Sequence, residues 1–199
     1  MIFGGGVAGV SCALVLGSAK NKLFAANKTI AIVSHQKSSS LQEALFNNAY
    51  GIEPGKTGAQ LLHDSLKHLD AMYPHVMQIC GEKVLKIEGS APQFTVCTNR
   101  NTYKTAIIIV AIGYSDTFAI EGLMQYVMPH QKTNPEKGHV QLKNADHKVD
   151  NGIYVAGNLA GWRSQLSIAS GSGASVATDI LTLWNGDLHT QIHDSIKNK

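Results

Sequence analysis

Residues 1–9 of this chain read MIFGGGVAG, in which Gly4, Gly6 and Gly9 have the spacing GxGxxG. A short apolar run precedes these glycines, a stretch of small apolar residues follows them, and the β-rich run 29–33 comes next. The order strand, glycine-rich turn, helix, strand is typical of a βαβ unit. We therefore expect an α/β fold with a Rossmann-like parallel sheet.

Each glycine of this turn has its own role when a strand precedes it and a helix follows. Gly4 permits the tight turn, Gly6 lets the backbone approach a pyrophosphate, and Gly9 lets the helix pack closely on the sheet. The helix N-terminus adds N–H donors and the positive end of its dipole. The pattern predicts a dinucleotide site, the alternative being a turn that is merely rich in glycine. The acid expected after the second strand is replaced by Ser34 and His35, and Ser34 remains a weaker candidate for binding the ribose.

The rest of the chain continues the alternation of helical and β-rich segments. Residues 34–56 read as a loop, and Thr57 is a candidate N-cap for a helix that extends to about residue 69. The other expected elements are a crossover β-meander built from runs 76–79, 84–87, 94–97 and 103–110, a central parallel strand at 106–112, strands at 140–142 and 153–155, and a final helix at 167–184.

Composition excludes several classes of function. The 199 residues carry a formal charge of +3 with no run of Lys or Arg, which argues against a nucleic-acid partner. Cys12, Cys80 and Cys97 form no CxxC pair, so we expect no disulfide framework, no zinc site and a reduced, cytoplasmic setting. His189 and His193 have metal spacing only if the tail is helical, and we expect no metal there. No apolar run of eighteen residues is present, so we expect no membrane contact.

Five blocks of sequence, taken in order, resemble the FAD-binding domain of the thioredoxin reductase family. They are the glycine turn at 4–9, NAYG at 48–51 with KTGAQLL at 56–62, AIG at 111–113, IYVAGN at 153–158, and QLSIASGSGASVA at 165–177. The resemblance implies FAD as the cofactor. The residues that would bind it are Gly4, Gly6, Val7, Ala8 and Gly9 at the pyrophosphate, Ser34 at the ribose, Val84 at the adenine, Asn48 near the flavin or ribityl chain, Ala111 and Gly113 at the strand end, Gly157 and Asn158 at the ribityl chain, and Gln165 and Leu166 at the flavin ring.

This chain departs from the family in two ways. Asn158 stands where the family has Asp, and a neutral amide is a weaker acceptor than a carboxylate. The family also carries an NAD(P)H-binding domain in the middle of the chain, where this sequence has only residues 114–137, too few for a βαβ unit of about 30 residues or more. We expect residues 1–199 to form one FAD-binding domain from segments 1–113 and 138–185, joined by the linker 114–137.

Three hypotheses for function follow from the resemblance. The first is a flavin oxidoreductase, with unknown catalytic residues, that exchanges electrons with a separate small-molecule or protein donor and acceptor. The second is a noncatalytic FAD-binding sensor or assembly subunit, and the third is a product of gene decay that no longer holds FAD. The resemblance also implies a homodimer.

Overall fold

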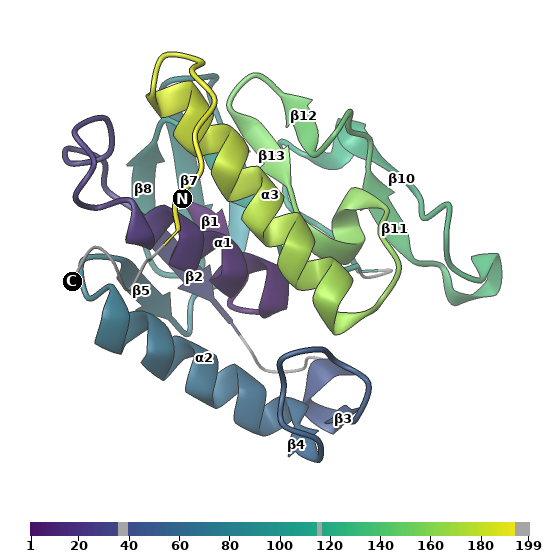
Figure 1. Cartoon of the computed structure of the whole chain (residues 1–199). Coiled ribbons are helices and arrows are strands. Elements are labelled where there is room, and N and C mark those ends of the chain that lie inside the picture. The colour runs from purple at the N-terminus through teal and green to yellow at the C-terminus, as the bar shows by residue number, and fades with distance from the viewer. Residues whose placement is uncertain (36–39, 115–116, 194–199) are drawn as a thin grey trace.

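A six-stranded sheet forms the centre of the molecule (Figure 1). The computed structural model describes residues 1–35, 40–114 and 117–193. In spatial order the strands are β12 (Lys148–Asp150), β13 (Ile153–Val155), β9 (Ile108–Val110), β1 (Ile2–Phe3), β2 (Ala31–Ser34) and β5 (Met77–Cys80). All neighbours pair in parallel except β12 and β13. The expected Rossmann-like sheet is therefore confirmed.

Helices cover one face of this sheet, and α1 (Val7–Ser18) and α3 (Leu166–Trp184) lie side by side on it (Figure 1). Their close approach depends on Gly173, because a Cβ there would lie 2.0 Å from the carbonyl oxygen of Ala8. The third helix, α2 (Gly58–Met72), packs Leu69 into the same core. None of the helices in the described ranges is long and apolar enough to cross a membrane.

The other face of the sheet is covered by an antiparallel meander of β6 (Val84–Glu88), β7 (Phe94–Thr98) and β8 (Thr102–Thr105). Alternate residues of each central strand serve the two layers. Ile2 joins the core beneath the helices, whereas Phe3 joins the core beneath the meander. A strand buried on both faces must be apolar throughout, which explains Ile108–Val110 of β9, the buried centre of the apolar run at 106–112.

One part of the expected meander is wrong. The run 76–79 overlaps β5, which pairs with β2 at the edge of the central sheet and is not part of the meander. The run 103–110 leads from β8, the last strand of the meander, into β9, the expected central parallel strand. A β-rich run does not show in its own sequence which strand it pairs with, because the pairing is set by contacts distant in the chain.

Several short elements occupy segments that the sequence analysis read as irregular. The hairpin β3 (Leu45–Phe46) and β4 (Lys56–Thr57) and the 3-10 turn η1 (Ser40–Glu43) lie in the expected loop, and η2 (Met124–Tyr126), β10 (Val127–Pro129) and η3 (Pro135–Lys137) lie in the expected linker. β10 pairs with β11 (Val140–Leu142), and η4 (Gly157–Ala160) follows β13. Residues 36–39 of the expected loop, 115–116 of the expected linker and the tail 194–199 lie outside the described residues.

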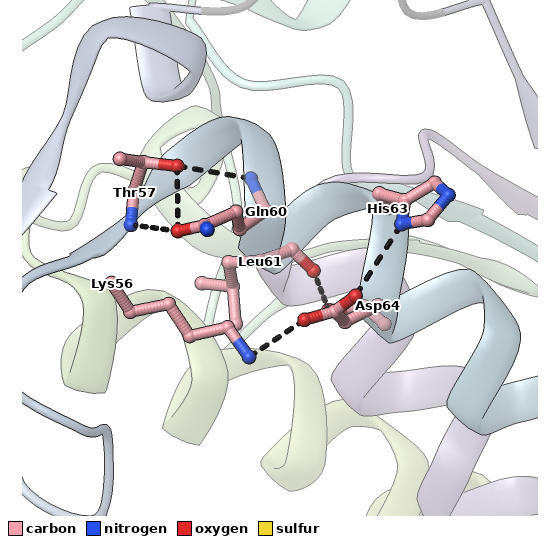
Figure 2. Close-up of polar contacts among 7 residues, drawn as sticks. Lys56, Thr57, Gln60, Leu61, His63 and Asp64 are labelled. Carbon is pink, nitrogen blue, oxygen red and sulfur yellow. Dashed lines mark hydrogen bonds and ion pairs between the residues drawn. The ribbon is translucent and has the colours of Figure 1, made fainter.

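The N-terminus of α2 confirms the predicted cap (Figure 2). The Thr57 hydroxyl accepts the Gln60 backbone N–H at 3.2 Å, and the Gln60 side-chain oxygen accepts the Thr57 backbone N–H at 2.9 Å. This reciprocal pair satisfies two N–H groups that lack helical partners. Asp64 lies one turn further along α2 than Gln60. Its Oδ2 is 2.7 Å from Nζ of Lys56, and this ammonium lowers the pKa of the Asp64 carboxyl.

Candidate functional site

A cleft of about 620 Å³ opens at the carboxyl ends of the central parallel strands. Phe3 and Val33 line it, as do Ala111 and Ala156, which follow β9 and β13. Open α/β sheets place ligands at this edge. The cleft therefore lies where the fold predicts a ligand site.

Both α1 and α3 begin at this cleft without a side-chain N-cap. The caps are Gly6, which has no side chain, and Gln165, whose side chain makes no capping hydrogen bond. A helix leaves its first backbone N–H groups without helical partners, and these donors together with the helix dipole favour an anion. Two helix N-termini thus present donors to one cavity.

The three glycines of the N-terminal turn have distinct environments. At Gly4, φ is +112° and a Cβ would lie 2.3 Å from the Ala111 carbonyl oxygen, while a Cβ on Gly9 would lie 1.8 Å from the Gly4 oxygen. A Cβ on Gly6 would meet no atom of the described residues within 4 Å, and Gly6 lines the cleft. Gly4 and Gly9 are therefore required by the packing of the protein, whereas Gly6 leaves open a space that a side chain would fill. This arrangement fits the pyrophosphate of a dinucleotide.

Buried polar side chains fix the position of the C-terminal part of the site, Gly157 and Asn158. The Ser172 hydroxyl accepts the Gly157 N–H at 2.8 Å and lies 2.9 Å from Nε2 of His147. The Asn158 carbonyl oxygen accepts the Nε2–H of His130 at 3.0 Å, a tautomer assigned because Nδ1 of that ring accepts a backbone N–H. Both Gly157 and Asn158 are thus positioned by side chains from other elements while they line the cleft.

An apolar wall completes the cleft on the side of the segment from η1 to α2 and of the β9–β10 connection. Its members from the first of these regions are Leu41, Ala44, Phe46 and Leu62, and those from the second are Ile112, Phe118, Ala119 and Ile120. None of these residues was predicted for the site: Leu62 and Ile112 lie in blocks that resemble the family but were given no role, and the others belong to no motif. They would exclude water from a planar ligand.

One buried carboxylate, Glu82, also lines the cleft, next to Lys83. It was absent from the predicted site. Its hydrogen bonds lower the pKa of the Glu82 carboxyl, the bond from Thr98 contributing most. Its sequence signal was its place three residues after the run 76–79, which the sequence analysis assigned to the meander.

Eleven of the fourteen predicted site residues line this one cleft: Gly4, Gly6, Val7, Ala8, Val84, Ala111, Gly113, Gly157, Asn158, Gln165 and Leu166. The other three do not. Gly9 lies in the helix packing behind Gly4, Ser34 is buried at the end of β2, and Asn48 is exposed in the β3–β4 turn. Their roles in binding stay predictions.

Trp162 and the two histidines of the tail, His189 and His193, lie away from the cleft lining. Trp162 donates its Nε1–H to Nε2 of His147 at 3.1 Å, and Nζ of Lys132 lies 4.4 Å from the centre of the Trp162 ring. Residues 188–193 form no helix, so the spacing of His189 and His193 does not place their rings on one helical face. Within ranges 1–35, 40–114 and 117–193, no three His, Cys, Asp or Glu residues form a group able to hold a metal ion.

Comparison with solved structures establishes the fold. The thioredoxin reductase of Gloeobacter violaceus matches with a TM-score of 0.71 at 13% identity, over 98% of this chain and 97% of that one. The oxidoreductase of Agrobacterium tumefaciens matches with a TM-score of 0.69 at 14% identity, over 92% of this chain and 97% of that one. The ferredoxin-flavin thioredoxin reductase of Clostridium acetobutylicum matches with a TM-score of 0.66 at 16% identity, over 92% of this chain and 97% of that one. At these identities the likeness concerns the fold alone.

Comparison with sequences gives a family but no close relative. No curated protein matched the chain. The model of the pyridine nucleotide-disulphide oxidoreductase family matches residues 1–162, which include the glycine turn, the meander and the start of the C-terminal part of the site. With most of its length matched, the chain belongs to the pyridine nucleotide-disulphide oxidoreductase family.

Proposed function

We propose that this protein binds FAD and functions as an oxidoreductase of the thioredoxin reductase-like type, taking electrons from a separate donor and passing them to a small acceptor. One observation carries the proposal: two uncapped helix N-termini and the open backbone at Gly6 meet in one cleft at the carboxyl edge of the sheet. Family membership makes a flavin the cofactor to test first.

The chain's own residues divide the work of binding. The backbone at Gly6, Val7 and Ala8 would hold the pyrophosphate through N–H donors at the start of α1. The N-terminus of α3 at Gln165 and Leu166 would favour negative charge on the flavin ring. FAD, when bound, supplies reversible uptake and release of two electrons. The apolar wall would keep water from the ring.

The proposal of a separate electron donor rests on the connection between β9 and β11. Residues 113–138 are too few for a second βαβ unit. In the described part of this connection, β10 pairs with β11 and His130 hydrogen-bonds to Asn158, so the segment packs against the FAD-binding part. One structural neighbour is a ferredoxin-flavin thioredoxin reductase, which supports testing a protein donor.

The proposal includes a homodimer in a reduced, cytoplasmic setting. The three cysteines are free, which fits a reducing environment. The sequence has no CxxC pair, and the three cysteines in the described residues are free, so the proposal includes no internal dithiol as electron acceptor.

The experiment begins with the purified protein. Denaturation should release FAD, identified by chromatography and mass, and anaerobic dithionite should bleach the bound flavin, with an acceptor restoring its colour. A colourless protein that does not take up added FAD would contradict the binding proposal. Bound flavin that cannot be reduced and reoxidised would favour the noncatalytic sensor or assembly subunit instead.

A further inference from the structure

We infer that Glu82 supplies the carboxylate that the end of β2 lacks, and that it binds the hydroxyls of the adenosine ribose. The inference rests on the proposed function, because it assigns a residue to one half of the FAD site. Dinucleotide-binding folds use an acid after the second strand for this ribose. Here Ser34 and His35 occupy that place.

The topology brings the two positions together. β5 is the parallel neighbour of β2, with Ser34 opposite Cys80, and the Gly81 N–H donates to the Ser34 carbonyl oxygen at 2.7 Å. Residues that follow β5 therefore emerge at the same edge of the sheet as residues that follow β2. Glu82 is the second residue after β5, and it lines the cleft together with His35.

The meander fixes the Glu82 carboxylate in place. Its Oε1 accepts the Asn101 amide at 2.7 Å and the Tyr103 hydroxyl at 3.0 Å, and its Oε2 accepts the Thr98 hydroxyl at 2.5 Å. The Lys83 backbone N–H donates to the Asn99 side-chain oxygen at 2.8 Å and so holds the same segment. The carboxylate is therefore oriented before any ligand binds.

The carboxylate also keeps capacity for a further donor. An ionised carboxylate accepts at about four positions, and the described residues use three of them, with Thr98 at Oε2. These donors, with Thr98 first, and the positive charge of Arg100 hold the pKa of Glu82 below its usual range, so the group is charged near neutral pH. A charged acceptor binds a hydroxyl more strongly than the buried Ser34 hydroxyl could.

The same charge determines specificity. Negative charge at Glu82 favours a free ribose diol and disfavours a 2′-phosphate at that position. Lys83, which follows Glu82 in the chain and also lines the cleft, would otherwise favour a phosphorylated ribose through its positive charge. The presence of Glu82 beside it selects an unphosphorylated adenosine.

The test compares two ligands on the apoprotein: FAD and its analogue with a 2′-deoxyadenosine. The wild type should bind the analogue about tenfold more weakly than FAD. Glu82→Gln should bind FAD about tenfold more weakly than the wild type does, and it should bind both ligands with similar affinity. Thr98→Val, which removes one donor but keeps the carboxylate, should retain the preference for FAD. Circular dichroism and thermal unfolding establish that each variant is folded.

Each contrary result has a distinct meaning. If the wild type binds FAD tightly but does not distinguish the analogue, the ribose role of Glu82 is overturned and the proposed function stands, a result that needs no variant to fold. If the preference survives in Glu82→Gln but is lost in Ser34→Ala, the ribose contact belongs to Ser34. If the wild type binds no FAD, both the proposed function and this inference are overturned.

Discussion

At the scale of single residues, Gly6 separates ligand binding from folding. Its φ of −80° is open to any amino acid, and a Cβ there would lie more than 4 Å from every atom of the residues that the structure describes. Gly6→Val should therefore fold with a loss in unfolding free energy of under about 1 kcal/mol. Its side chain would occupy the space needed at the pyrophosphate, so FAD affinity should fall by more than about tenfold. Denaturant unfolding of the apoprotein and FAD titration measure the two effects.

Two further glycines provide the controls for Gly6. Gly171 lies in α3, and a Cβ there would also meet open space. Gly171→Ala should leave FAD binding unchanged and raise the free energy of unfolding by up to about 1 kcal/mol. Gly9→Ala should lower the free energy of unfolding by about 1–3 kcal/mol or more, because the new Cβ would overlap the Gly4 carbonyl oxygen. Unchanged FAD binding by folded Gly6→Val would contradict the proposed site.

Glu82 also predicts a pH dependence of stability. Hydrogen bonds, with that from Thr98 first, lower the pKa of its carboxyl in the folded protein below the ordinary value of 4.5. A group with a lowered folded pKa contributes stability above its unfolded pKa and loses it as the pH falls through the folded pKa. The stability difference between the wild type and Glu82→Gln should therefore be full at pH 7 and shrink below about pH 4.5. Denaturant unfolding across pH 3–7 measures it, with Glu53→Gln as the control for replacing an exposed glutamate.

The cysteines should not take part in the flavin chemistry. Burial raises the pKa of the Cys12 thiol to about 12, so it does not form a reactive thiolate at neutral pH. Cys80 is exposed and Cys97 is half-buried, and both are free. The triple variant Cys12→Ala, Cys80→Ser, Cys97→Ser should reduce and reoxidise its flavin at nearly the wild-type rate. A large loss of turnover in a folded, flavin-loaded triple variant would revive a thiol mechanism.

At the scale of elements, the cap of α2 gives a prediction for stability. Thr57 accepts an otherwise unpaired N–H at the start of the helix. Thr57→Ala should lower the free energy of unfolding by about 1 kcal/mol and Tm by about 2–4 °C. Thr57→Ser keeps the hydroxyl and is the matched control. Equal thermal stability of the alanine and serine variants would show that the capping box contributes little.

The elements found from sequence were those with a local signal. Thr57 and the helical period that follows identify α2, and the apolar run at 106–112 identifies β9. β12 was missed because Lys148–Asp150 is short and polar, and it is held mainly by pairing with β13. β5 was recognised as a strand but placed in the wrong sheet, because its partner β2 lies more than 40 residues earlier in the chain.

At the scale of the whole molecule, the short β9–β11 connection predicts how the flavin is reduced. A resident nicotinamide site makes hydride transfer effectively intramolecular, an advantage of up to several kcal/mol. Free NADPH should therefore bleach the bound flavin slowly and without saturation, whereas dithionite or a partner reductase should bleach it readily. Anaerobic stopped-flow absorbance against NADPH and NADH concentration is the measurement. Fast, saturable reduction by either nucleotide would require the separate-donor proposal to be withdrawn.

The sequence by itself determined the βαβ start, the glycine turn and the helix cap, because each depends on spacing within a short segment, and eleven of the fourteen residues predicted for the site do line the cleft. Only the tertiary structure decided that Glu82 lies beside the end of β2 and that His130 holds Asn158. It also decided which of the three glycines leaves open space at the cleft, since Gly4 and Gly9 are constrained by Ala111 and by each other. The physical reason is that a parallel sheet gathers strand ends from distant parts of the chain at one edge, and the resulting contacts leave no local pattern in the sequence.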